Sequence, residues 1–195
     1  MKRLAALMLA AAGVVAGCGE RIERVDSDRD VLLDDRWNDT DLNMVSSKMV
    51  QSLLSHDAVA KAEGKPAIMV GTVANRTAEH IDVKALTDRI RTALVKSGKV
   101  VAVDETARGE IAKEYEYQAS GNVDPATRKG PGKQRGPEFL LRGDVAQDVH
   151  KSGDGDTKSI WYKVTMQLTN VESNTLEWTD DITIKKVKAN SGVRF

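Results

Sequence analysis

The sequence is poor in the residue types from which most catalytic and metal sites are built. Its 195 residues include one cysteine, three histidines and only 4% aromatic residues. A single cysteine excludes both an intrachain disulfide framework and a zinc site made of several cysteines. Basic and acidic side chains are equal in number, 29 of each, so the chain has no overall attraction for nucleic acid. We therefore expect no nucleic-acid partner.

The sequence also lacks an apolar run long enough to cross a membrane as a helix. Its first run, residues 4–17, has 14 residues, whereas a hydrocarbon core of roughly 30 Å needs about 20. Basic Met1-Lys2-Arg3 precedes this run, as in a secretory signal. The run ends in Val14-Val15-Ala16-Gly17-Cys18, which resembles a bacterial lipobox. We interpret residues 1–17 as a lipoprotein signal peptide and Cys18 as the lipidation site, in preference to an uncleaved anchor or a plain secreted signal.

The segment after the cysteine is acidic. Residues 19–40 hold eight acidic and four basic side chains, which predicts a solvated tether. Lipoproteins retained at the inner membrane often carry aspartate after the cysteine. Because Gly19 stands there, the resemblance favours an outer-membrane lipoprotein that faces the periplasm. Val31-Leu32-Leu33 and Trp37 are too apolar for a pure spacer, so they are expected either to dock on the domain or to bind a partner.

The remaining chain shows helical patterns first and strand patterns last. We expect helices over 41–56, 83–97 and 106–119, and strands over 67–73, 100–103, 139–149, 160–169 and 176–184. Thr40 or Asp41 is predicted to cap the first helix, Asp82 the second, and Gly98 to end the second. Gly71 indicates a bulge or a close backbone approach.

These elements predict an α/β (α+β) fold. A strand, a helix and a strand in succession favour a parallel pair, and the last three strands favour an antiparallel meander. The expected architecture is a single domain over residues 41–190. It has a mixed sheet, in which a β-α-β unit is followed by the three-strand meander, and helices packed on the sheet. Residues 18–40 form the lipidated cysteine and the acidic tether.

One loop interrupts all periodicity. Residues 121–137 contain three of the four prolines, four glycines, and four basic side chains against one acidic one. This composition predicts an exposed, locally basic loop. Aromatic residues are not interleaved with the basic ones, so single-stranded nucleic acid is a poor fit. An acidic protein surface or an anionic glycan remains a possible contact.

Motifs for catalysis and metal binding are missing. His56, His80 and His150 are far apart, and no pair has the spacing of a helical metal site. The nucleophile elbow G-x-S-x-G is absent. Gly64-Lys65 and Gly98-Lys99 lack the other residues of a phosphate-binding loop. We expect no enzymatic activity, no catalytic residue, no metal site and no cofactor.

One stretch is more specific than the periodic patterns. Residues 70–82 have the sequence VGTVANRTAEHID. They are followed by Leu86, Arg89-Ile90-Arg91, Ala93-Leu94 and Ser97-Gly98-Lys99. Further along the chain come Leu141-Arg142-Gly143, residues 162–169 and Leu176-Glu177-Trp178. This succession resembles the LpoB family, the outer-membrane lipoproteins that activate class A penicillin-binding proteins. The resemblance covers roughly residues 41–187 and the lipoprotein start.

The resemblance implies a non-enzymatic regulator of peptidoglycan synthesis. Such a lipoprotein binds a small non-catalytic domain of a bifunctional synthase and stimulates glycan polymerisation and crosslinking. We expect a monomer. The best-known member has a long, proline-rich segment before its domain, whereas here only residues 19–40 intervene. The alternatives are a structural or assembly lipoprotein, similar to the periplasmic domain of curli secretion lipoproteins, and an envelope enzyme or small-ligand binder.

Candidate partner-binding residues lie in the loop between the first strand and the second helix. They are Asn75, Arg76, Thr77, Glu79 and His80. A loop held between two rigid elements presents polar groups in a defined arrangement, which suits recognition. The competing interpretation is that Asn75 and Thr77 only satisfy nearby backbone groups, as turn residues do.

Overall fold

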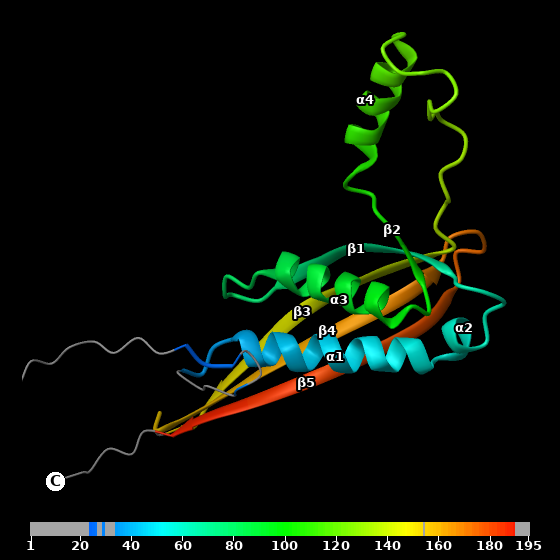
Figure 1. Ribbon diagram of the computed structural model, residues 1–195. Helices are drawn as coiled ribbons and strands as arrows, with labels where there is room; N and C mark the ends of the chain where they lie inside the picture. The colour runs from blue at the N-terminus through cyan, green and yellow to red at the C-terminus, as the bar shows by residue number, and fades with distance from the viewer. Residues whose placement is uncertain (1–23, 27–28, 30–33, 154, 190–195) are drawn as a thin grey trace, which may run out of the picture.

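A five-stranded sheet forms the centre of the protein (Figure 1). The computed structural model describes residues 24–26, 29, 34–153 and 155–189. The elements in chain order are α1 (Asp39–Ser55), α2 (Asp57–Ala60), β1 (Ala67–Arg76), α3 (Val83–Ser97), β2 (Val101–Val103), α4 (Arg108–Ala119), β3 (Phe139–Lys151), β4 (Thr157–Asn170) and β5 (Leu176–Ala189). The predicted signal peptide, Cys18 and Val31-Leu32-Leu33 lie outside the described residues.

The strand order is β2-β1-β3-β4-β5. β1 is parallel to both of its neighbours, β2 and β3. β3, β4 and β5 are successive antiparallel neighbours. The expected β-α-β unit and three-strand meander are therefore confirmed, and the parallel pairing of β1 with β3 joins them into one mixed sheet.

β1 is longer than its sequence pattern predicts. It continues to Arg76 because residues 73–76 pair with residues 143–146 of β3. The register shifts between Val70 and Val73, which confirms the bulge expected at Gly71. A Cβ atom at Gly71 would lie 3.0 Å from Cδ1 of Leu140, so β1 and β3 also approach closely there.

The helix boundaries follow local capping chemistry. α1 begins after Asn38, whose side chain accepts a hydrogen bond from the Asp41 amide at 3.0 Å. The Asp41 carboxylate in turn accepts from the Asn38 amide at 2.9 Å. This capping box satisfies two amides at once, so the cap expected at Thr40 or Asp41 was wrong by two or three residues. Asp82 caps α3, as predicted. The same helix ends at Gly98, which has a φ of 66°, also as predicted.

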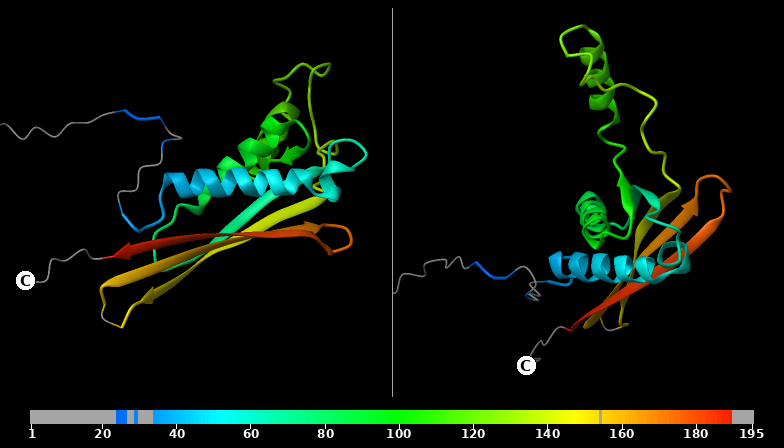
Figure 2. Two further views of the ribbon diagram at one scale, coloured as in Figure 1. Left: turned by 90° about the horizontal axis from the view of Figure 1, so that it is seen from below. Right: turned by 45° about the vertical axis from the view of Figure 1, so that its right-hand side comes forward.

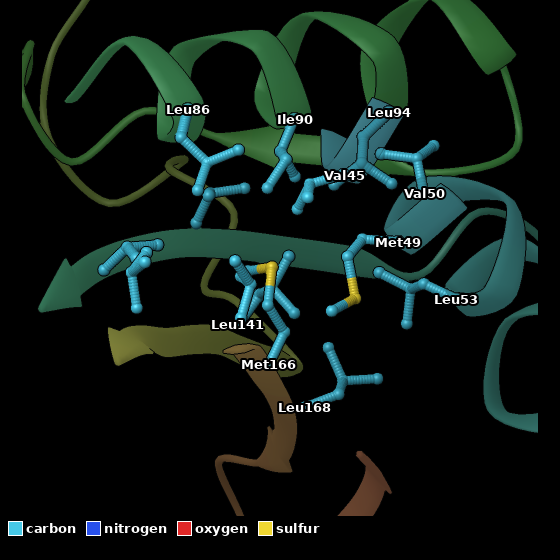
Figure 3. Packing of buried hydrophobic residues seen from close by; sticks show 14 of the residues in the cluster. Val45, Met49, Val50, Leu53, Leu86, Ile90, Leu94, Leu141, Met166 and Leu168 are labelled. Carbon is cyan, nitrogen blue, oxygen red and sulfur yellow. The ribbon is translucent and has the colours of Figure 1, made fainter. Parts of the chain in front are cut away.

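The hydrophobic core lies between the sheet and two helices. α1 packs against α3 and β5, and α3 packs against β1 (Figure 1). Figure 3 shows side chains of α1 and α3 meeting those of β3 and β4, namely Val45, Met49, Val50, Leu53, Leu86, Ile90, Leu94, Leu141, Met166 and Leu168. On β4, alternate residues from Ile160 to Leu168 are buried, whereas Trp161 and Lys163 between them are exposed. The helices therefore cover only one face of the sheet.

The helix α4 stands apart from this core. None of its residues is buried, and in Figures 1 and 2 it projects from the body together with residues 120–137. The returning loop contacts it through two hydrogen bonds, from the Lys129 amide to Gln118 at 2.5 Å and from Gln134 to the Tyr115 hydroxyl at 3.4 Å. The prediction of helices packed on the sheet is thus confirmed for α1 and α3, while α4 packs on its own loop. Within the described residues, no helix combines the length and the hydropathy needed to cross a membrane.

Gly143 offers a test of the packing between β3 and β4. A Cβ atom at this position would overlap the carbonyl oxygen of Thr165 and lie 3.1 Å from Cγ of Met166. We expect Gly143→Ala to lower the free energy of unfolding by about 1–3 kcal/mol, because neither backbone can move away freely. The midpoint of urea unfolding measures the change. Gly136→Ala, where a Cβ atom meets nothing within 4 Å, is the control and should leave the midpoint nearly unchanged.

Candidate functional site

Asn75 and Arg76 were expected in the loop after the first strand, but the structure places them in β1, which continues to Arg76 because it pairs with β3. With the turn that follows them they form the loop over residues 75–80, which is held in shape by its own side chains. Oδ1 of Asn75 accepts hydrogen bonds from the amide and the hydroxyl of Thr77 at 2.9 and 2.8 Å. Nδ2 of Asn75 donates to the Glu79 carbonyl at 2.8 Å, and Oγ1 of Thr77 accepts from the Glu79 amide at 3.1 Å. Asn75 and Thr77 therefore do what turn residues do, which is one of the two interpretations that the sequence left open.

Glu79 points away from the loop and joins it to the sheet. Its Oε1 accepts hydrogen bonds from the Tyr162 hydroxyl of β4 at 2.7 Å and from Nε2 of Gln147 of β3 at 2.6 Å. Its Oε2 accepts from the backbone amide of Trp37 at 3.3 Å. One carboxylate thus binds the sheet on one side and the segment that precedes α1 on the other.

Trp37 docks on the domain, as one of the two sequence interpretations proposed. It packs against the core, and its ring meets that of Tyr162 edge-on, with centroids 5.7 Å apart. Two residues earlier, Asp35 forms an ion pair with Lys158 at 3.1 Å. The hydrogen bond from Lys158 lowers the pKa of Asp35 below its ordinary value. The end of the acidic segment is therefore part of the folded unit.

A buried ion pair fastens the same segment to β5. Nζ of Lys186 lies 2.6 Å from Oδ2 of Asp41, and both side chains are at most 10% exposed. The same ammonium donates to the backbone carbonyl of Arg36. Because Asp41 also closes the capping box of α1, this pair fixes the start of the helix against the sheet edge. Removal of either partner would leave a buried charge without compensation.

Two of the five candidate residues remain available to a partner. Arg76 and His80 are exposed. The guanidinium of Arg76 lies 3.8 Å from the Asp144 carboxylate, and its side chain is 70% exposed, so this contact restrains it weakly. The loop thus presents one arginine and one imidazole on a frame held by Asn75, Thr77 and Glu79.

The contact of Tyr162 and Gln147 with Glu79 has no counterpart in the sequence pattern. Tyr162 lies in the buried row of β4, among apolar residues. A buried tyrosine hydroxyl requires a polar partner. This requirement is the sequence feature that could have indicated a hydrogen bond from Tyr162 to a polar side chain. The partner could not be named, because Glu79 lies 83 residues away along the chain.

The histidines serve separate local roles. Nδ1 of His56 accepts a hydrogen bond from the Ala58 amide at 3.3 Å at the start of α2. His150 lies 3.0 Å from Asp148 on the surface. In the part of the chain that the structure describes, no group of three His, Cys, Asp or Glu side chains is placed to hold a metal ion.

The ionisation of Tyr162 gives the network a measurable pH dependence. Burial and the hydrogen bond to Glu79 raise the pKa of Tyr162 above its ordinary value of 10.0. Above pH 10 the unfolded chain therefore loses this proton while the folded chain keeps it. The free energy of unfolding then falls by about 1.4 kcal/mol for each pH unit. We expect the stability advantage of the wild type over Tyr162→Phe to be constant below pH 9 and to shrink between pH 10 and 12. Urea unfolding at a series of pH values measures it, and an advantage that does not change with pH would contradict the assignment.

One of the comparisons with known proteins identifies a family. The family model described as peptidoglycan-synthase activator LpoB matches residues 41–184. Similar solved structures include the C-terminal domains of LpoB from Salmonella enterica and from Escherichia coli. Each has 18% identity and a TM-score of 0.47, and covers 75% of this chain and 99% of that domain. A lipoprotein from Neisseria meningitidis has 13% identity and a TM-score of 0.41, with 66% and 88% covered. No curated protein matches the chain.

The structural likenesses are too distant to carry an argument by themselves, but the family model spans well over half of the sequence, including the loop and the strands that form the Glu79 network. The protein therefore belongs to the LpoB family of peptidoglycan-synthase activators.

Proposed function

We propose that this protein is a lipid-anchored, non-enzymatic regulator that binds and activates a bifunctional class A penicillin-binding protein. The match of the LpoB model to residues 41–184 is the observation that carries the proposal. The lipobox-like sequence before Cys18 supports an anchor in the outer membrane, with the domain in the periplasm. A regulator of this kind needs no catalytic residue, only a surface that distinguishes two states of its partner.

The loop over residues 75–80 is our candidate for that surface. Arg76 and His80 would contact the synthase, while Asn75, Thr77 and Glu79 hold the loop in position. A preorganised loop loses little conformational entropy on binding, so more of the contact energy remains available. Activation then requires only that the active synthase binds more tightly than the inactive one. A tenfold preference corresponds to about 1.4 kcal/mol.

The docked segment limits how far the domain can stand from the membrane. Asp35 and Trp37 are bound to the domain, so only residues 19–34 remain as a spacer after Cys18. Fully extended, this spacer reaches at most about 58 Å. The proposal therefore implies that the synthase extends toward the outer membrane, or that the two membranes are close at the place of contact.

Binding of residues 19–195 to a class A penicillin-binding protein from the same cell tests the function. We expect Arg76→Glu to weaken binding by about tenfold and His80→Ala by a smaller factor, because each removes a direct contact at the edge of the interface. Titration of the labelled domain measures the dissociation constant, and the rate of glycan polymerisation measures activation. Lys48→Glu, a charge reversal on an exposed position of α1, is the matched control.

The outcomes separate the site from the function. Unchanged binding by both loop variants would show that the synthase contacts another surface. A failure of the wild-type domain to bind any class A enzyme of that cell would contradict the proposed function itself.

A further inference from the structure

The two edges of the sheet differ in length. At one edge, β2 has only three residues. At the other, β5 has 14 residues and, within the part of the chain that the structure describes, pairs with β4 alone, as Figure 1 shows. Among the described residues, no backbone hydrogen bond reaches the outer side of β5 from another segment. A long uncovered edge strand is a template on which another strand can pair.

The central sequence of β5 is complementary to itself. It reads Asp180-Asp181-Ile182-Thr183-Ile184-Lys185-Lys186. If two copies pair in antiparallel fashion with Thr183 opposite Thr183, each Asp181 faces a Lys185 and each Ile182 faces an Ile184. Such a pairing is isologous, because both copies use the same residues.

The two faces of β5 suit this register. Asp181, Thr183 and Lys185 are exposed on the face that the helices leave open. Ile182 is half-buried and Ile184 buried on the helix side. The pairing would therefore place two pairs of opposite charges on the solvent-exposed face of the sheet. On the helix side it would extend the apolar layer. Cross-strand pairs of both kinds stabilise antiparallel sheets.

Neighbouring residues on β4 already orient the charged side chains. Nζ of Lys185 lies 4.7 Å from the ring centroid of Trp161, and Asp181 lies 3.5 Å from Nζ of Lys163. Less side-chain freedom is lost when restrained groups pair. Lys186 keeps its ion pair with Asp41 and contributes no contact to the pairing.

We propose that β5 is a self-association edge, on which a second copy of this chain pairs about a two-fold axis at Thr183. The two sheets become one continuous sheet, and the assembly carries two predicted lipid anchors and two copies of the loop over residues 75–80. Two acylated chains hold a membrane more firmly than one. The resemblance to the LpoB family led us to expect a monomer, so the oligomeric state distinguishes that expectation from this proposal.

A single cysteine at the axis tests the register directly. In the pairing, the Cα atoms of the two residues at position 183 are about 4.5–5.5 Å apart, which lies within the range of about 4.4–6.8 Å that a disulfide spans. Thr183→Cys in the full-length chain should therefore form a disulfide-linked dimer in cell envelopes under mild oxidation. Thr179→Cys is the matched control on the same face of β5, because its two copies would be about 27 Å apart. Cys18 is present in both variants and in the wild type, which gives the background.

Charge reversal tests the complementarity. In the Thr183→Cys background, Asp181→Lys and Lys185→Asp should each reduce the linked fraction by roughly tenfold, because like charges then face each other. The double reversal restores opposite charges and should restore the linked fraction. The proposal is overturned if Thr183→Cys stays monomeric, links as weakly as Thr179→Cys, links only to a different protein, or if the double reversal fails to restore the dimer.

Discussion

The carboxylate of Glu79 is the interaction on which the arrangement of the candidate site depends. It accepts hydrogen bonds from β3, from β4 and from the segment before α1. A partly buried carboxylate is costly unless its oxygens are satisfied, and the buried Tyr162 hydroxyl needs an acceptor equally. Each partner therefore constrains the other, so the loop over residues 75–80 and the end of the acidic segment share one support.

This shared support links the tether to the proposed partner surface. The chain arrives at the domain through Asp35 and Trp37, and the Lys186–Asp41 pair holds the start of α1 nearby. The membrane anchor that we propose upstream would thus hold the domain by the same sheet that carries the loop. Among the described residues, helices cover one face of the sheet, and no helix or strand covers the opposite face or the β5 edge.

Local patterns predicted most of the fold, whereas the site depended on contacts between distant parts of the chain. The apolar rows of α1, α3 and β4 indicated their elements correctly because each repeats with the period of its own backbone. The last three residues of β1 were missed because their pairing with β3 supplies the extended conformation. Helix α4 was predicted because Ile111 and Tyr115 have helical spacing, but nothing local could show that these two side chains lie away from the core. The bond between Glu79 and Tyr162 spans 83 residues and leaves no periodic signal.

Amide hydrogen exchange over residues 34–38 tests the central role of Glu79 most directly. The account predicts slow exchange in the wild type. In Glu79→Ala, the exchange should be about tenfold faster or more. A hydrogen bond to a charged acceptor contributes about 1.5–3 kcal/mol, and about 1.4 kcal/mol corresponds to a factor of ten. Amides in α3 and in the centre of β4 should keep their protection. Equal exchange of residues 34–38 in the two proteins would show that Glu79 does not hold this segment, and the account would be contradicted.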